Sequence, residues 1–432
     1  MDNEANLCQD ARSKVRVAVG KDEEKPLMQT KIQNRLRTDG FRKGIRRCTP
    51  RNPRRTCLPK SAHRALECLV PIGVDPQLSL SKERPHSLMR TDGKAEIQHY
   101  VPQVLLRLHA SDPSAKKGSE QIWCFDKHTD KMFPANIRGV LAGNRFYEIE
   151  ANGQSLSLEE PLSDIEGRLS PILTRLVREQ KLANLTNEDR STIASFCAAQ
   201  MLRTQVFRDR IKDLTEGVAE ALRKRGIDPS EVSNFKLLSD EEIKAFSMDM
   251  VADAPKYEPH FLSKYWHLIG TTPDDPFHVG DHPLVLDNDL GRGPGTLGLA
   301  SPGVTIYLPL SPTLCLAMTD PALIEELFAG ARKVRDGCEA FKKKIEADGF
   351  PARGMGLLKM MQESRDTVNQ QIAPMELGIP SAHEPQVVTR VNSLQMLNAG
   401  RWIISSKPDF SLPLKMLADD PGFRERRKFE VE

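Results

Sequence analysis

Apolar residues recur with a helical period through the middle of this 432-residue chain. Over residues 162–180 they fall three or four positions apart, which predicts an amphipathic helix. Thr186, with Asp189 three residues later, is typical of a helix N-cap, so the next helix is predicted to run from 187 to about 225. Gly226 is placed to end that helix.

Three more helices are predicted later in the chain. Ser239 is a candidate N-cap for a helix over residues 239–252, and Pro321 suits the first turn of a helix that ends near Ala347. A last helix is predicted over residues 386–401.

Short runs of apolar, β-branched and aromatic residues predict strands on both sides of this helical stretch. These runs lie at 122–126, 140–150 (a short strand or a turn), 267–270, 276–279, 283–286, 304–308, 314–318 and 402–404. The run at 283–286 is predicted to continue the strand at 276–279, and the runs at 304–308 and 314–318 to form a hairpin. The glycine-rich segment 287–303 is predicted to be a mobile loop.

Helices outnumber strands in this pattern, so the predicted fold class is α+β and mainly helical. We expect a helical centre flanked by a small, split, mostly antiparallel sheet, with no internal repeat and no coiled-coil heptads. The predicted organisation is a basic leader over 1–95, a folded domain over 96–410 and a charged tail over 411–432. The chain is expected to fray after Pro408.

The leader differs from the rest of the chain in charge. Residues 1–95 hold 21 Lys and Arg against 11 Asp and Glu, and from 31 to 64 there are twelve basic residues and one acid. Its apolar residues follow no fixed period, so disorder is predicted. Such a segment suits an arm that binds nucleic acid through counterion release. The alternatives are a solvated tail, or residues added by a wrongly chosen start codon.

Composition sets the class of the remaining chain. It is 39% hydrophobic and 28% charged overall, with no apolar run near eighteen residues, so no membrane partner is expected. The part after the leader is mildly acidic, which argues against a broad nucleic-acid-binding face there. No two of the eight cysteines have CxxC spacing, and Cys197 and Cys315 lie in apolar runs. Buried, free thiols and a cytoplasmic location are therefore expected.

A series of short motifs, in a fixed order, resembles one family. The motifs are His99-Tyr100-Val101-Pro102-Gln103 with Arg107, Trp123-Cys124-Phe125-Asp126-Lys127, Asn144-Arg145-Phe146-Tyr147, Ile165-Glu166, Gln200-Met201-Leu202-Arg203-Thr204, Gly280-Asp281-His282-Pro283-Leu284 with Leu308-Pro309-Leu310-Ser311-Pro312, and Val391-Asn392 with Arg401. Together they resemble the DUF4238 family over about residues 96–410. The family often has a second histidine where this chain has Gln98, and Ser or Thr where it has Gly280. Because the family's function is unknown, the resemblance implies no activity.

The polar residues of these motifs form the candidate site. They are His99, Tyr100, Gln103, Arg107, Glu166, Gln200, Arg203, Asp281 and Arg401. His99 and Asp281 are candidate catalytic residues, as an acid–base pair or as ligands of a divalent metal, which is the one cofactor suggested. With the arginines to hold a charge-dispersed transition state, this set suits a metal-dependent nuclease or phosphoesterase.

The same residues also fit a structural role. His99 and Tyr100 suit a hydrogen-bonded entry to a helix, and Asp281 suits the cap of a turn. Glu166 and Arg203 suit either an internal ion pair or a bidentate contact to an anionic ligand. The alternative hypothesis is therefore a non-catalytic binding or structural protein. His278 and His282 are four apart near a turn, a spacing that says little about metal, and HExxH, GxxxxGK[ST] and GxSxG motifs do not occur.

Overall fold

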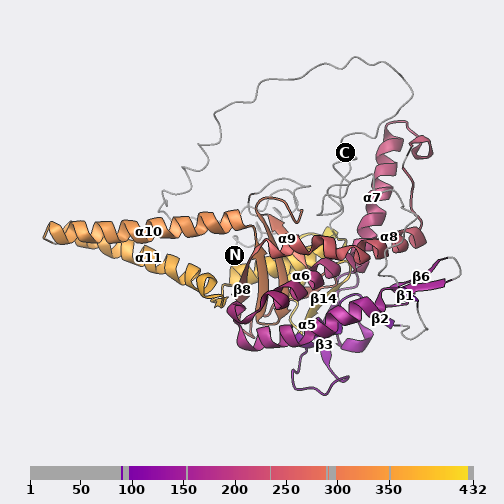
Figure 1. The fold of residues 1–432 in the computed structure, drawn as a ribbon, viewed down its shortest axis with the longest axis horizontal. Coiled ribbons are helices and arrows are strands. Elements are labelled where there is room, and N and C mark those ends of the chain that lie inside the picture. The colour runs from indigo at the N-terminus through magenta and orange to yellow at the C-terminus, as the bar shows by residue number, and fades with distance from the viewer. Residues whose placement is uncertain are drawn as a thin grey trace, which may run out of the picture.

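The computed structural model describes residues 89–90, 97–151, 154–233, 235–288, 290, 298–349 and 352–426. Figure 1 shows a central body from which α7 with α8 and the pair α10 and α11 project. The helices are α4 (Gln103–Leu108), α5 (Glu159–Glu179), α6 (Asn187–Leu202), α7 (Gln205–Lys224), α8 (Asp240–Ala252), α9 (Glu258–Leu262), α10 (Pro321–Ala347), α11 (Ala352–Leu377), α12 (Pro385–Asn398) and α13 (Ser411–Asp419).

Within the described residues the strands form four small sheets, in which almost all neighbours are antiparallel. The strands are β1 (Met89–Arg90), β2 (Ile97–His99), β3 (Gln121–Asp126), β4 (Lys131–Asn136), β5 (Ala142–Asn144), β6 (Glu148–Ala151), β7 (Gln154–Ser157), β8 (Tyr265–Gly270), β9 (Val279–Gly280), β10 (Val285–Asn288), β11 (Val304–Ser311), β12 (Leu314–Thr319), β13 (Pro380–Ser381) and β14 (Trp402–Ser405). Their orders are β10-β11-β12-β8-β13, β4-β3-β14-β9, β1-β7-β6 and β2-β5. The predicted mainly helical α+β fold with mostly antiparallel sheets is confirmed.

Helix α6 lies at the centre of the body. Ile193, Phe196 and Cys197 on this helix are fully buried, and α6 packs against α5, α8 and α9. Every residue of β11 and β12 is also buried. A helix that is apolar on nearly all sides needs such covering, since an exposed face would leave apolar area in water.

Several predicted local signals are confirmed. Thr186 and Asp189 form a capping box at the start of α6, and Ser239 forms another with Glu242 at α8. Gly226 follows α7 with φ of 72°, the left-handed conformation that a C-terminal glycine permits. The predicted hairpin is the β11–β12 pair.

The predicted single helix over 187–225 is wrong, because it is two helices. Arg203 ends α6 with ψ near 2°, and Thr204 is extended with ψ of 159°. The Thr204 hydroxyl accepts the backbone N–H of Phe207 and so caps α7. The chain therefore turns at the motif residues Arg203 and Thr204, which places both side chains where two helices meet.

Two further predictions about the sheets and helices are corrected. The segment 283–286 does not continue the strand before it, because β9 pairs with β14 while β10 pairs with β11 in a different sheet. The prediction of no coiled-coil heptads is wrong for α10. Its buried residues Ile324, Ala331, Cys338 and Ile345 recur every seven positions.

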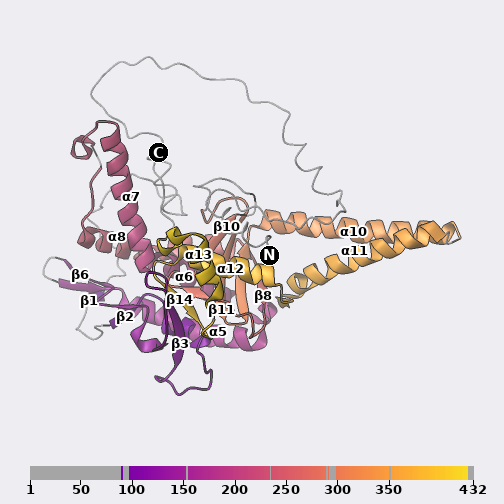
Figure 2. The same cartoon turned by 180° about the vertical axis from the view of Figure 1, so that it is seen from behind.

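Residues outside the predicted bounds of the folded domain also form described structure. Met89 and Arg90 form β1 on β7, before the predicted boundary at residue 96. After Pro408 the chain does not fray: Met416 of α13 and Phe423 pack in an apolar cluster with Phe125. Helix α13 lies beside α12, as seen from behind in Figure 2.

The remaining expectations can be compared with the structure only in part. Cys197 and Cys315 are free and buried, as predicted. Almost all of the basic leader, and residues 289 and 291–297 of the predicted loop, lie outside the described residues. None of the helices that the structure describes has the length and apolar character needed to cross a membrane.

Candidate functional site

A cavity of about 390 Å³ lies between α4, α5 and the end of α6. Five of the nine predicted site residues line it: His99, Gln103, Arg107, Glu166 and Arg203. The other lining residues are Val104, Lys117, Tyr147, Glu159, Leu162, Ser163, Gly167 and Ser170. The cavity is therefore mostly polar, with charged groups of both signs on its walls.

Three residues spaced four apart form the α4 wall. The Arg107 Nη2 group donates to Gln103 Oε1, the Gln103 amide nitrogen donates to His99 Nδ1 over 3.4 Å, and His99 Nε2 donates to the Ile137 carbonyl over 3.2 Å. Arginine can only donate and a carbonyl oxygen can only accept, so the direction of every hydrogen bond in this series is fixed. His99 is therefore the neutral tautomer protonated at Nε2. Burial also lowers the pKa of His99 below 6.5.

Arg203 forms the floor of the cavity. It is 2% exposed, and its Nη2 group donates to Glu166 Oε1 over 2.6 Å and to the His99 carbonyl over 3.0 Å. Its guanidinium carbon lies 5.7 Å from the centre of the Tyr147 ring. Within the described structure, the buried Arg203 Nε has no hydrogen-bond partner. The guanidinium is thus held in place while one donor is left unused.

One face of α5 forms the opposite wall. Glu159, Ser163, Glu166 and Ser170 follow at intervals of four, three and four, which brings them to the same side of the helix. The Glu159 carboxyl has no ion-pair or hydrogen-bond partner among the residues described, and burial followed by the charge of Glu166 raises its pKa. Glu159 was missed from the sequence. It lies three residues before the predicted start of the helix at 162, and its distance of seven residues, two helical turns, from Glu166 was the available signal.

Lys117 stands at the mouth of this cavity. It is exposed, and the contacts of the described residues give it no anionic partner. Arg107 is less free, since its Nε lies 3.3 Å from Glu120 Oε1. The cations of the site therefore differ: Arg203 is buried, Arg107 is paired and Lys117 is open to solvent.

The predicted residues Tyr100 and Gln200 lie outside the cavity lining. The Gln200 side chain is fully buried, and its Nε2 donates to the Tyr100 carbonyl over 2.9 Å. The Tyr100 ring is also buried, and it packs against Phe146 with 5.3 Å between ring centres. These contacts join α6 to the entry of α4.

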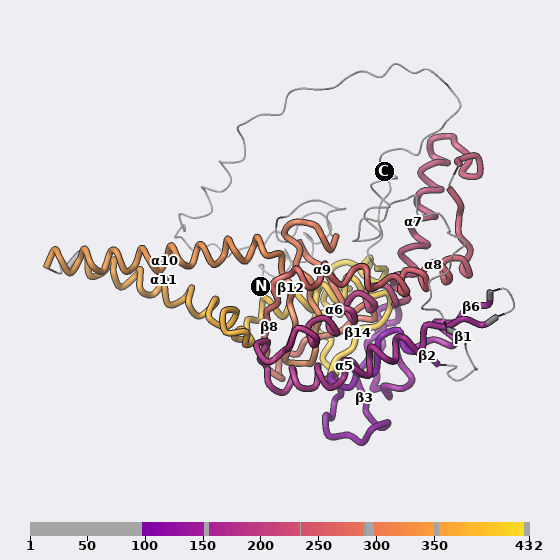
Figure 3. The backbone as a smooth tube through the Cα atoms, viewed as in Figure 1, coloured from indigo at the N-terminus to yellow at the C-terminus, as the bar shows by residue number. Residues whose placement is uncertain are grey.

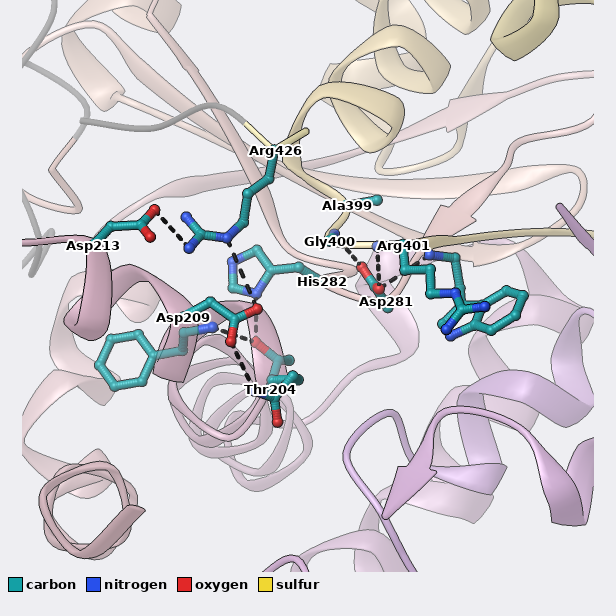
Figure 4. Close-up of polar contacts among 12 residues, drawn as sticks. Thr204, Asp209, Asp213, Asp281, His282, Ala399, Gly400, Arg401 and Arg426 are labelled. Atoms are coloured by element: carbon teal, nitrogen blue, oxygen red, sulfur yellow. Dashed lines mark hydrogen bonds and ion pairs between the residues drawn. The ribbon is translucent and has the colours of Figure 1, made fainter. Parts of the chain in front are cut away.

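Asp281 and Arg401 also lie elsewhere, in a group that we call the Asp281 cluster (Asp281, Gly400, Arg401 and Trp402). The Asp281 carboxylate accepts the backbone N–H groups of Gly400, Arg401 and Trp402 over 2.7, 2.8 and 3.1 Å, the first two of which are drawn in Figure 4. Burial raises the pKa of Asp281 against the lowering effect of these donors. The carboxylate thus joins the segment after β9 to the start of β14.

The Arg401 side chain completes this cluster without facing the cavity. Its guanidinium pairs with Asp126 through Nη2–Oδ2 and Nε–Oδ1 distances of 2.7 and 3.2 Å. It also stacks on Trp402, with 4.5 Å from the guanidinium carbon to the ring centre. The structure therefore does not bring Asp281 or Arg401 to the cavity with His99.

His282 lies beside the Asp281 cluster and is fully engaged (Figure 4). Arg210 donates to its Nε2 over 3.3 Å, so the neutral ring donates from Nδ1 to the Thr204 hydroxyl oxygen over 2.8 Å. Burial, with Arg210 and Arg426 nearby, holds the pKa of His282 well below 6.5. Over the described ranges, no group of three or more His, Cys, Asp or Glu side chains is arranged to hold a metal ion.

The fold and this cavity define an α+β domain with a helical centre and a polar site at one side of it. A family model described as a protein of unknown function (DUF4238) matches residues 97–409. The chain belongs to this family. Neither a curated protein nor a solved structure matches it.

Proposed function

We propose that the domain binds a small anionic molecule in the cavity between α4 and α5. The observation that carries this proposal is the Nε donor of Arg203, which is buried at the cavity wall and has no partner within the described structure. A buried donor without an acceptor costs free energy of about 1–3 kcal/mol. A phosphate or carboxylate oxygen that reached this N–H from the cavity would remove that cost.

The charges around the cavity are consistent with an anion. Arg203 is neutralised by Glu166 and Arg107 by Glu120, while Lys117 has no counter-charge in the described contacts. Glu159 is the one unpaired acid on the wall, and burial raises its pKa. An incoming negative charge would therefore meet one free cation at the mouth and the Arg203 guanidinium at the floor.

A second candidate function is hydrolysis of a phosphoester or a similar ester. It is favoured by two titratable groups that line one cavity: Glu159, whose raised pKa suits proton transfer, and His99, whose ring is neutral. Arg203 would stabilise negative charge that develops on the substrate. Asp281, which the sequence suggested as the partner of His99, has no part in this version because three backbone N–H groups occupy it.

Isothermal titration of the full chain with inorganic phosphate and with pyrophosphate tests the proposal. The informative variant is Lys117→Ala, and the matched control is Lys116→Ala, since both lysines are exposed and only Lys117 lines the cavity. We expect saturable binding that Lys117→Ala weakens roughly tenfold and Lys116→Ala leaves unchanged. Absence of saturable binding to the folded protein, or equal effects of the two variants, would contradict the proposal.

A further inference from the structure

The cavity between α4 and α5 takes its positive and its negative side chains from different segments of the chain. The basic residues that line it come from α4, from the loop after α4 and from the end of α6, and they are Arg107, Lys117 and Arg203. Both acids that line it, Glu159 and Glu166, come from α5, which packs against α6, as the chain trace of Figure 3 shows. The site therefore has an acidic wall as well as cations.

Most of these charges are neutralised within the protein. Each of the two arginines pairs with a glutamate, over 2.6 Å at Arg203 and over 3.3 Å at Arg107. Lys117 and Glu159 are left, and among the described residues neither side chain has an ion-pair or hydrogen-bond partner. The two unpaired charges that line the cavity are therefore of opposite sign and are not paired with each other.

Glu159 is partly shielded from water. The residue is half-buried, and burial, followed by the charge of Glu166, raises its pKa. Glu166 lies seven residues further on, about 10 Å along the helix axis. Of these two acids, Arg203 donates only to Glu166. A carboxylate that is shielded from water and has no counter-charge gains more from an incoming cation than an exposed acid does.

A simple anion would use only part of this arrangement. A phosphate or carboxylate group can pair with Lys117 and with the Arg203 guanidinium, but it brings a second negative charge into the cavity that Glu159 lines and leaves that acid without a partner. A ligand that also carries an ammonium group supplies the missing counter-charge, since an ammonium donates three hydrogen bonds and accepts none. The cavity volume of about 390 Å³ lies within the range of small-molecule sites.

We infer that the ligand of this cavity is a small zwitterion, whose anionic group binds at Lys117 and Arg203 and whose ammonium group binds at Glu159. Amine-bearing phosphate monoesters and amino acids share this chemistry. The hydrogen bonds at both ends of such a ligand are charge-assisted, so each end contributes to affinity. This inference rests on the proposed anion site and adds the second charge of the ligand.

Isothermal titration of the full chain with phosphoethanolamine and with ethyl phosphate tests the second charge, because the two molecules differ only in the amine. At pH 7.5 we expect phosphoethanolamine to bind the wild type about tenfold more tightly than ethyl phosphate, the factor that a hydrogen bond to a charged group contributes. Titration with β-alanine and with propionate repeats the comparison for a carboxylate. The tighter of the two amine-bearing ligands shows which anionic group the site prefers.

The informative variant is Glu159→Gln, and the matched control is Glu160→Gln. Glu160 is the next residue of the same helix, but it is exposed and does not line the cavity. Glu159→Gln should bring the ratio of the two dissociation constants close to one, because a neutral amide cannot form the ion pair. Glu160→Gln should leave the ratio unchanged. The melting temperature of each variant shows that it is folded.

The possible results separate the zwitterion from the anion site itself. If ethyl phosphate or propionate binds and the amine adds nothing, the zwitterion is overturned while the anion site stands. The same holds if Glu159→Gln keeps the preference for the amine, or if Glu160→Gln removes it equally. If none of the four molecules binds the folded wild type, the proposed anion site fails and the zwitterion fails with it.

Discussion

The Asp281 cluster and the cavity between α4 and α5 contain the same kinds of side chain but differ in how their hydrogen-bonding groups are used. Asp281 accepts three backbone N–H groups, and Arg401 is bidentate to Asp126. In the cavity, the Arg203 Nε has no partner within the described residues, and neither has the Glu159 carboxyl. Buried polar groups are almost always satisfied in folded proteins. The two groups of residues therefore differ in how far their hydrogen-bonding capacity is used, although buried atoms without a partner also occur away from the cavity, as at Arg210 Nε.

The largest expected effect is a loss of folding stability at low pH, caused by protonation of buried histidines outside the cavity. Burial lowers the pKa of His109, His267 and His278 to about 4, and that of His282 further below its usual value. The unfolded chain binds these protons near pH 6.5, so stability is complete above that pH and is lost as the pH falls towards 4. Each histidine should contribute about 2 kcal/mol to this loss at pH 5.

Thermal unfolding at pH 7.5, 6.0 and 5.0 measures this effect. The raised pKa of Asp281 acts in the opposite direction, because its folded form takes up a proton more readily than the unfolded form. It offsets only part of the effect of four histidines. A melting temperature that stays constant from pH 7.5 to 5.0 would show that these rings are not held neutral in the fold.

Removal of the Asp281 carboxylate should have the next largest effect. Asp281→Ala leaves three buried N–H groups at residues 400–402 without an acceptor, so we expect a loss of about 4 kcal/mol in the free energy of unfolding. Urea unfolding measures it. A loss below about 1 kcal/mol would remove the distinction between the Asp281 cluster and the cavity.

Arg203→Ala should lower the free energy of unfolding slightly less than Asp281→Ala does. The substitution leaves Glu166 and the His99 carbonyl without their donor, and the expected loss is about 3 kcal/mol. Glu166→Gln is the companion variant, and it should cost less because the Glu166 side chain is 27% exposed and can be hydrated. An unchanged melting temperature of Arg203→Ala would exclude a buried ion pair at the cavity floor.

Glu159→Gln should have the smallest effect, with the opposite sign. Because burial raises the pKa of this unpaired acid, its charge disfavours the folded state above pH 4.5. The variant should therefore be slightly more stable than the wild type at pH 7.5 and equal to it at pH 4. Solvent screening of this partly exposed group keeps the gain below about 0.5 kcal/mol. A clear loss of stability at pH 7.5 would mean that Glu159 has a structural partner.

Local signals in the sequence predicted much of the fold. The caps at Thr186 and Ser239 and the left-handed Gly226 depend on residues close together in the chain, and all three were identified. The break at Thr204 was missed because the apolar period continues through it and only the Thr204 cap marks the second helix. The heptads of α10 were missed because the small residues Ala331 and Cys338 stand at seam positions.

The candidate site was harder to predict, because which side chains share a cavity depends on contacts between segments far apart in the sequence. His99, Gln103 and Arg107 were found together because they are spaced four apart in one short segment of the chain. Asp281 was grouped with them by residue type, but its partners lie about 120 residues later in the chain. Gly280, which stands where the family often has Ser or Thr, also depends on a distant segment. A Cβ there would lie 3.2 Å from the Gln395 carbonyl oxygen.

The most direct test of the central claim follows the Nε–H group of Arg203 by NMR while inorganic phosphate is added to the full chain labelled on arginine. Arg210 is the internal control, because its Nε is also buried without a partner in the described structure, but it does not line the cavity. Arg203→Lys assigns the signal. We predict a saturable shift of the Arg203 signal and a constant Arg210 signal. A constant Arg203 signal at saturating phosphate, or an equal shift of both, would contradict a ligand site at Arg203.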